Sequence, residues 1–370
     1  MGGWWCGGRV VDAGHVAGLF PPQDRDWGLP LEVQGLSPKA AQRVARQVAL
    51  LTYDPAAQTL SEDWGTQLDG KQVQRWALKL GQKLVEVQAQ EVLAYEKGQR
   101  PQGPANAPEL LVVGLDGGRV QGRDKDPESG SRWREDKVLT ITSYRPGNGR
   151  DREPEHLLST CVATMADSQA FGKLARVEAE RRGVRQARRV LLIRDGAAWI
   201  DTQHQEHFGR HERIVDYYHA NEHLHEQAKA LYPQLEVRRK QWAEKLETLL
   251  WRGQITGLIR ILAACTRKLG SPQDNDPPGH PRRVAAQNLG YFSKHQAHMN
   301  YPAYRKLGWP IGSGNVEGGV KQVNKRVKGT EQFWNQEGVE PILALRALRL
   351  SQDERWDHYW LCGRLPRQAA

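Results

Sequence analysis

Three acidic residues that lie far apart in this chain could together bind metal ions. Asp116 ends the apolar run Leu-Leu-Val-Val-Gly-Leu-Asp-Gly-Gly, and Asp195 ends a second run, Arg-Val-Leu-Leu-Ile-Arg-Asp-Gly. Each run predicts a buried strand that delivers a carboxylate to its end, where glycine turns the chain. The third acid, Glu317, follows Ile-Gly-Ser-Gly-Asn-Val and lies just inside a predicted helix. These three residues are the expected catalytic and metal-binding set.

Carboxylates of this kind suit divalent-metal chemistry on phosphate. Mg²⁺ and Mn²⁺ prefer oxygen ligands, and two such ions about 3.5–4 Å apart can clamp the attacking and leaving oxygens of an in-line displacement. Because the metal activates water or a 3′-hydroxyl, no nucleophilic side chain is required. The acids are separated by 79 and 122 residues, so the fold must bring them together. A single Asp-Gly pair after an apolar run is more often only a turn, but the three acids together favour a two-ion site.

The helix predicted around Glu317 combines this acid with a basic row. Valines recur with helical spacing from Val316 to Val327 and form one apolar stripe. Cationic residues follow Glu317 along the adjacent face, where metal and phosphate could be bound side by side. The alternative is a solvated amphipathic helix whose first-turn glutamate suits the helix dipole. The cationic residues expected to bind DNA here are Lys321, Lys325, Arg326 and Lys328.

A fourth cluster lies in the run Ile-Val-Asp-Tyr-Tyr-His-Ala-Asn-Glu-His-Leu-His, residues 214–225. Asp216 and His219 are three residues apart, and His223 follows His219 by four, so in a helix these residues share a face. A zinc site is conceivable, but the run contains no cysteine and no His-Glu-x-x-His motif. We therefore expect Asp216 and His219 to support the site through hydrogen bonds rather than to ligate a metal.

A helical region with exposed basic residues is predicted ahead of this chemistry. Residues 36–98 have the pattern of short helices joined by brief turns, the first capped by Ser37 with Pro38 at its first position. The last helix presents Lys71, Arg75 and Lys79 on its outer face. Such a region suits a helix-turn-helix that binds DNA. A plain helical bundle with a charged, solvated face fits the same pattern equally well.

Composition divides the chain into segments. Residues 1–35, rich in glycine, tryptophan and proline, are predicted to be irregular. Three prolines and two glycines between residues 98 and 108 predict a linker, residues 99–109. The α/β core is assigned to residues 110–235 and 309–360, and the helical pattern of residues 236–308 indicates an insertion within it. A last helix, residues 339–350, is expected to leave Arg346 and Arg349 at the surface.

Bulk composition favours a partner of opposite charge. The chain has 53 Lys and Arg against 43 Asp and Glu, a net charge of +10 and a pI near 9.5. This balance favours a polyanion, although it is also a common background value. No apolar run approaches the roughly 20 residues that span a bilayer, and no signal-peptide pattern is visible, so we expect a cytoplasmic protein. The four cysteines are far apart and form no C-x-x-C pair, which predicts reduced thiols.

Four motifs, in this order, resemble the DDE transposases of bacterial insertion sequences: Val-Gly-Leu-Asp-Gly-Gly, Leu-Ile-Arg-Asp-Gly, Ile-Val-Asp-Tyr-Tyr-His and Trp-Pro-Ile-Gly-Ser-Gly-Asn-Val-Glu. The similarity covers about residues 36–360 and is greatest to the Kra-type group, which is related to the Mutator-like superfamily. It implies a ribonuclease-H-like core with a helical insertion, preceded by an all-α, helix-turn-helix-like region. Asp116, Asp195 and Glu317 match the three catalytic acids, and Asp216 and His219 match the [C/D]-x-x-H signature of Mutator-like enzymes.

The resemblance also implies a function. The protein would be a DNA transposase that cuts the ends of its element and joins the 3′-hydroxyl to target DNA by two-metal phosphoryl transfer, with two Mg²⁺ or Mn²⁺ ions. Its partners would be the terminal repeats of the element and the target DNA. A homodimer on DNA is expected because two ends must be handled together, in a bacterial cytoplasm and at the nucleoid. The alternatives are a catalytically silent DNA-binding protein derived from a transposase and a nuclease that cuts without joining.

Two features depart from the family pattern. Many relatives carry paired cysteines near the N-terminus, where this chain has only Cys6. After Glu317, relatives often have Ala and Cys, whereas this chain has Gly318 and Gly319. Two glycines would loosen the start of the helix by about 1 kcal/mol each. The first departure concerns recognition of the element ends, and the second leaves the catalytic acid in place.

Overall fold

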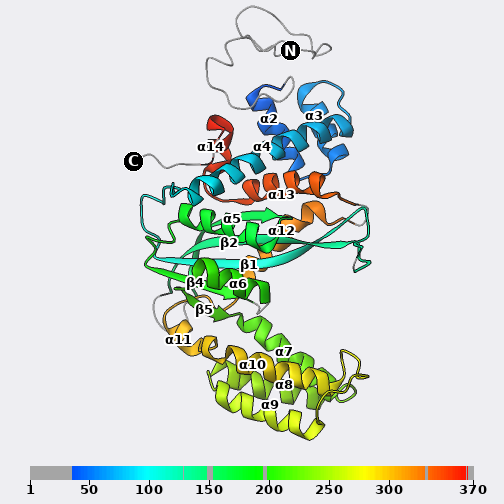
Figure 1. The fold of residues 1–370 in the computed structure, drawn as a ribbon, viewed down its shortest axis with the longest axis vertical. Helices are drawn as coiled ribbons and strands as arrows, with labels where there is room; N and C mark the ends of the chain where they lie inside the picture. Colours follow the sequence, from blue (N-terminus) through cyan, green and yellow to red (C-terminus); the bar gives the residue numbers. More distant parts are fainter. Residues whose placement is uncertain are drawn as a thin grey trace, which may run out of the picture.

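The computed structural model of the chain describes residues 36–127, 129–147, 153–194, 198–329, 332–363 and 365. The predicted irregular segment 1–35, which contains Cys6, lies outside these ranges, and so does the candidate ligand Asp195. The described residues form a five-stranded mixed sheet flanked by helices, with a helical lobe on one side of it (Figure 1).

The sheet combines antiparallel and parallel strands in the order β3-β2-β1-β4-β5. β1 (Leu110–Gln121), β2 (Trp133–Arg145) and β3 (Glu155–Thr164) pair antiparallel in succession. β4 (Arg189–Arg194) lies parallel to β1, and β5 (Glu212–Val215) lies parallel to β4. The two strands that the Asp-Gly motifs predict are therefore β1 and β4, and they are direct neighbours.

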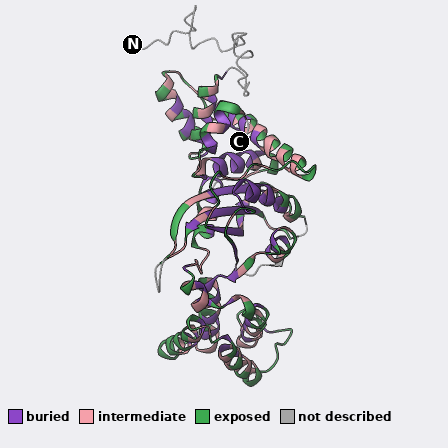
Figure 2. Cartoon of the chain, turned by 90° about the vertical axis from the view of Figure 1, so that its left-hand side faces the viewer, coloured by how far each residue is buried: buried purple, intermediate pink, exposed green. Residues whose placement is uncertain are grey.

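Helices cover both faces of this sheet. The helices that lie on the sheet are α5 (Ser168–Arg181), α6 (Ala198–Phe208), α12 (Gly314–Val327) and α13 (Gln336–Leu350), and those that pack on these helices or on one another are α2 (Pro38–Val48), α3 (Tyr53–Trp64), α4 (Gly70–Glu96) and α14 (Arg355–Cys362). α5 and α6 pack on one face, and α12 and α13 pack on the other, where α4 packs on α13 (Figure 1). Burial is concentrated in the sheet and the helices next to it, whereas the outer surfaces of the lobe are exposed (Figure 2).

Side-chain alternation along β1 separates the two faces. The odd-numbered residues from Leu111 to Leu115 pack with α5 and α6. Even-numbered residues point to the opposite face, where Leu110 packs toward the helical lobe and Val120 packs with α12 and α13. Asp116 is an even-numbered residue between these two hydrophobic clusters. The candidate carboxylate is therefore on the α12 face of the sheet.

The N-terminal helices form a bundle that shares its core with the sheet. α2 begins as predicted, with Ser37 Oγ accepting a hydrogen bond from the backbone N of Ala40 at 3.3 Å. α4 is one continuous helix of 27 residues, and its Gly81 lies so close to α13 that a Cβ would be 2.4 Å from Pro341 O. One hydrophobic cluster runs from these helices through α12, α13 and α14 to the sheet. The domain boundary at residues 99–109 stays a prediction.

α7 (Tyr217–Leu231) leads from β5 into the helical lobe. The lobe contains α8 (Glu236–Trp251), α9 (Ile255–Leu269), α10 (Pro281–His295), the 3-10 helix η1 (Gln296–His298) and α11 (Tyr301–Lys306). These helices lie within the segment predicted to be a helical insertion. Their core continues under β4 and β5 through Leu191, Ile193 and Ile214. The chain returns from the lobe to the sheet at α12, the helix that carries Glu317.

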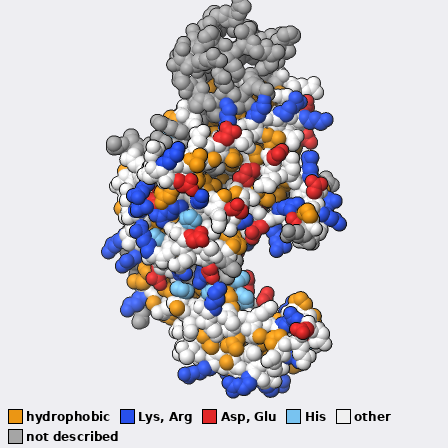
Figure 3. Space-filling view, in the orientation of Figure 1, with side chains coloured by type: hydrophobic (Ala, Val, Ile, Leu, Met, Phe, Trp, Pro, Cys, Tyr) orange, Lys and Arg blue, Asp and Glu red, His pale blue; other side chains and the backbone are white. Residues whose placement is uncertain are grey.

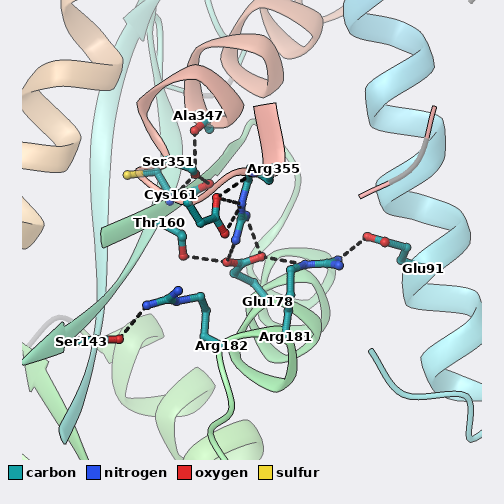
Figure 4. A network of polar contacts seen from close by, with 11 residues as sticks. Glu91, Ser143, Thr160, Cys161, Glu178, Arg181, Arg182, Ala347, Ser351 and Arg355 are labelled. Atoms are coloured by element: carbon teal, nitrogen blue, oxygen red, sulfur yellow. Dashed lines mark hydrogen bonds and ion pairs between the residues drawn. The ribbon is translucent and has the colours of Figure 1, made fainter. Parts of the chain in front are cut away.

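A buried ionic network joins α4, α5, β3 and α14 (Figure 4). Glu178 of α5 accepts hydrogen bonds from Thr160 Oγ1 at 2.7 Å and from Arg355 Nη2 at 2.7 Å. Arg181 lies 3.3 Å from Glu178 and 2.7 Å from Glu91 of α4, measured between nitrogen and carboxylate oxygen. The network fastens both the N-terminal helices and the C-terminal helix to the core.

The helices and the cysteines of the described ranges can be compared with the expectations for membranes and thiols. None of the helices in the described ranges combines the length and the apolar character that a membrane span requires. Cys161, Cys265 and Cys362 are free thiols. Burial raises the pKa of the Cys161 thiol to about 11, so this residue packs as a small apolar side chain.

Candidate active site

The first two acids belong to neighbouring parallel strands, because Asp116 lies within β1 and position 195 directly follows the last residue of β4. The pairing of β1 with β4 runs from Leu110 opposite Arg189 to Gly114 opposite Ile193. Asp116 comes two residues after Gly114, and position 195 comes two residues after Ile193. Of this pair the structure places Asp116, because residues 195–197 lie outside the described ranges.

Helix α12 runs alongside β1 in close contact. A Cβ on Gly114 would be 1.9 Å from Val316 Cγ2, and a Cβ on Gly118 would be 1.9 Å from Asn324 Nδ2. Four strand residues and eight helical residues each advance about 12–13 Å, so strand and helix run side by side in the same direction. The two glycines of β1 therefore allow α12 to approach the strand that carries Asp116.

Asp116 and Glu317 line one cavity of about 240 Å³. Asp116 is half-buried, and its Oδ1 accepts a hydrogen bond from the backbone N of Gly117 at 2.7 Å. Glu317 is exposed, and its Oε2 lies 3.1 Å from Lys321 Nζ. The fold thus brings together two predicted acids that are 201 residues apart in the sequence. The other polar residues that line this cavity are Arg194, His219, Glu222 and Ser313.

Asp216 connects the two helices that border this cavity. Its buried carboxylate caps α7 by accepting hydrogen bonds from the backbone N of Tyr218 at 2.6 Å and of His219 at 3.1 Å. The other oxygen accepts from Ser313, through the backbone N at 2.6 Å and through the hydroxyl. His219 lines the cavity, with Nδ1 at 3.6 Å from Glu222 Oε2. Asp216 therefore fixes the start of α12 relative to α7, which is the arrangement that a supporting role requires.

A further carboxylate, Asp136 on β2, lies near Asp116 and is not among the residues that the sequence indicates. Asp136 pairs with Gly118 in the sheet and is fully buried beneath Asn324. Burial raises the pKa of Asp136 to about 6, and the nearby carboxylates of Glu135 and Asp116 act in the same direction. Asp136 lies in the charged run Trp-Arg-Glu-Asp-Lys. Such a run is typical of an exposed segment, so the sequence does not indicate that Asp136 is buried.

The donor chemistry of the cavity fits divalent ions of the magnesium type. Asp116 and Glu317 offer carboxylate oxygens, which Mg²⁺ and Mn²⁺ prefer. Within the described ranges, no three acidic, histidine or cysteine side chains lie together as a set that could hold a metal ion. The third expected ligand, Asp195, is outside those ranges. Of the three expected ligands, the structure thus describes two, Asp116 and Glu317, that could hold an ion.

Most of the basic residues expected to contact DNA are exposed. Lys and Arg side chains are numerous over the body of the molecule and along the outer edge of the lobe, and the surface is hollowed between the two (Figure 3). The exposed residues of the expected set are Lys71, Arg75 and Lys79 on α4, Lys321 and Lys325 on α12, and Lys328 directly after α12.

The prediction that Arg326 binds DNA together with the lysines of this basic row is wrong, because Arg326 is buried. It is 3% exposed, and its Nε donates a hydrogen bond to Val48 O at 2.7 Å. Its guanidinium lies 5.2 Å from the ring centre of Tyr53. Arg346, expected at the surface, is likewise buried and donates to Ala49 O at 2.8 Å. Both arginines bind carbonyls at the C-terminal end of α2, the negative end of the helix dipole.

The two glycines after Glu317 differ in what surrounds them. A Cβ on Gly319 would be 2.4 Å from Thr140 Cγ2 of β2, whereas nothing lies within 4 Å of a Cβ on Gly318. We expect Gly319→Ala to destabilise the protein by about 1–3 kcal/mol, because the added methyl pushes α12 away from the sheet. Gly318→Ala should stabilise it by up to about 1 kcal/mol, since alanine favours a helix.

Thermal unfolding of the two alanine variants side by side measures this difference. Thr140→Ser removes the methyl group that the new side chain meets. Because Thr140 is buried, this loss costs about 1 kcal/mol by itself, so Thr140→Ser should destabilise Gly318→Ala but should destabilise Gly319→Ala less, or stabilise it. Equal unfolding temperatures for the two alanine variants would contradict the close packing of α12 on β2.

Comparison with known proteins gives distant structural likeness but no family. No protein family matches this chain, and no curated protein is similar to it in sequence. Among solved structures, it is similar to the Drosophila P element transposase strand transfer complex, with a TM-score of 0.40 and 10% identity over 87% of this chain and 93% of that one. The match is weak, and neither fold nor function is assigned from it.

Proposed function

We propose that this protein is a DNA transposase of the Kra-type group of bacterial insertion sequences, and that its mixed sheet is a ribonuclease-H-like core. The observation that carries the proposal is the convergence of Asp116 and Glu317 on one cavity, with exposed lysines on the same helix as Glu317. Position 195 comes two residues after Ile193, the last residue of β4 that pairs with β1, and this spacing supports Asp195 as the third acid.

Asp116, Asp195 and Glu317 would hold two Mg²⁺ or Mn²⁺ ions. Such ions activate water or a 3′-hydroxyl and stabilise the charge that develops on the phosphate. Asp116 pairs with Val138 of β2, so the backbone that carries its carboxylate is held by the sheet. Lys321, now paired with Glu317, would exchange this partner for a DNA phosphate. Asp216 would keep the start of α12 in position.

DNA is the proposed substrate and partner. Exposed basic side chains can contact phosphates, which position DNA without reading its sequence. They are Lys325 on α12, Lys328 directly after it, and Lys71, Arg75 and Lys79 on α4. The enzyme would nick the ends of its element and join the freed 3′-hydroxyl to target DNA. We propose a homodimer for this step, because two element ends must be joined together, acting in the bacterial cytoplasm.

The test is incubation of the purified protein with Mn²⁺ and labelled DNA that carries both ends of its own element. We expect nicks at the ends and products joined to a second DNA, both lost when EDTA removes the metal. Nicks without joined products would identify a nuclease instead. Specific binding of the ends without cleavage in Mn²⁺ or Mg²⁺ would identify a catalytically silent DNA-binding protein.

A further inference from the structure

A second cavity, of about 570 Å³, adjoins the candidate active site. Aromatic rings from the sheet, from α7 and α8 and from the segment before α12 form its walls, together with one guanidinium group and the carboxylate of Glu153. We call it the aromatic cavity, and its walls include Tyr144, His156, Tyr218, Trp251, Trp309 and Arg305. Asp116 and Glu317 line the other cavity and not this one.

Contacts behind the rings hold them in place. Tyr218 is 61% exposed, and its ring lies against Gly312, where a Cβ would be 2.6 Å from Tyr218 Cδ2. The guanidinium of Arg305 lies 3.6 Å from the ring centre of Trp251. Trp309 stacks on a buried tyrosine of α11, with ring centres 6.0 Å apart. Rings fixed in this way offer flat surfaces that lose little freedom when a ligand binds.

The two cavities share the chain segment that leads to Glu317. Gly312, Gly314 and Asn315 line the aromatic cavity, whereas Ser313 and Glu317 line the acidic one. The start of α7 also contributes consecutive residues to the two cavities. A ligand held at the acidic cavity would therefore have its adjoining part next to the aromatic rings.

We propose that the aromatic cavity holds one unstacked base of the DNA strand whose phosphate is bound at the acidic cavity, an inference that rests on the proposed function. Tyr and Trp faces stack on bases of any identity. Asn315 and Tyr144, which hydrogen bond to each other, offer polar groups to the edge of a base. Arg305 adds a positive charge for the neighbouring phosphate. An aliphatic ligand would use neither the ring faces nor these polar groups.

Three labelled duplexes of one sequence test the proposal, in EDTA so that no cleavage occurs. The first is fully paired, the second carries one unpaired adenine, and the third carries an unpaired abasic nucleotide at the same place. We expect the protein to bind the unpaired adenine about five- to a hundredfold more tightly than the abasic nucleotide, as base stacking on an aromatic residue implies.

Tyr218→Ala and Trp251→Ala should each bring these two affinities within about twofold of one another, without changing affinity for the paired duplex. Tyr218→Phe keeps the ring and should keep the preference. Leu93→Ala, a change at an equally exposed apolar residue on α4, should also keep it.

The outcomes separate this inference from the proposed function. Equal binding of adenine and abasic duplexes by the unsubstituted protein, or a preference that survives both alanine variants, would overturn the base-binding site and leave the transposase proposal standing. Failure to bind any of the duplexes would overturn both.

Discussion

Asp116→Asn and Glu317→Gln are each expected to lower metal-dependent cleavage of the element ends by at least about a thousandfold, equivalent to about 4 kcal/mol of transition-state stabilisation. Each substitution keeps the shape of the side chain but removes its negative charge and a ligand that Mg²⁺ and Mn²⁺ prefer. Affinity for the same DNA in EDTA should stay within about threefold, because the basic side chains that contact phosphates are unchanged. Single-turnover cleavage and a binding titration measure the two quantities.

Glu337 provides a matched control. It is an exposed glutamate in the first turn of α13, as Glu317 is in the first turn of α12. Glu337→Gln makes the same chemical change outside the cavity, so cleavage and binding should both be retained. Full cleavage by Asp116→Asn or Glu317→Gln would remove that residue from the proposed site. Parallel loss of DNA binding would show that the substitution acts through the fold rather than through the metal.

The strands of the two Asp-Gly motifs could be predicted from the sequence, but their pairing with one another could not. The run from Leu110 to Leu115 is continuously apolar, as is typical of a strand with both faces buried. Periodicity identifies such a strand without fixing its partners, because strand order depends on the assembly of the whole sheet. The parallel pairing of β1 with β4 therefore appears only in the structure. The meeting of Asp116 with Glu317 depends in turn on how α12 packs on β1.

β3 could not be predicted by the same criterion. Its sequence, Glu-His-Leu-Leu-Ser-Thr-Cys-Val-Ala-Thr, shows neither strict alternation nor a long apolar run. Polar residues can be buried here because other elements satisfy them, as Thr160 Oγ1 donates to Glu178 and the backbone N of Cys161 donates to Ser351 Oγ. Both partners lie on other elements, 18 and 190 residues away along the chain, so no local pattern identifies this strand.

Arg326 and Arg346 show the corresponding limit for helices. Helical periodicity places each arginine on a face of its helix, but it does not indicate which other element covers that face. The C-terminal end of α2 covers both residues, and its carbonyls at Val48 and Ala49 accept their hydrogen bonds. A basic residue beside an apolar stripe is therefore available to DNA only where no third element packs over it, as at Lys325.

Glu178→Gln is expected to lower the free energy of unfolding by about 3–5 kcal/mol at pH 7, because it removes a buried charge that two arginines share. The side chains of Glu178 and Arg355 are 4% and 3% exposed, and Arg181 also contacts Glu178 (Figure 4). Such a loss corresponds to a fall of roughly 5–15 °C in Tm. Glu244→Gln is the control, since Glu244 pairs with Lys240 at the surface, where an ion pair contributes little.

Glu178→Gln should destabilise the protein less in acid than at pH 7. Burial alone raises the pKa of Glu178, but the charges and hydrogen bonds of Arg355 and Arg181 outweigh it and lower the pKa from 4.5 to about 2. Because the pKa is lower in the folded state, the carboxylate stabilises the protein above about pH 4.5, and this contribution is lost as the pH falls toward 2. The gap in Tm between the unsubstituted protein and Glu178→Gln should therefore be constant from pH 7 to pH 6 and clearly narrower at pH 3. A gap of the same size at pH 3 would show that the glutamine acts through packing instead of charge, and the network would then fasten α4 and α14 to the core by shape alone.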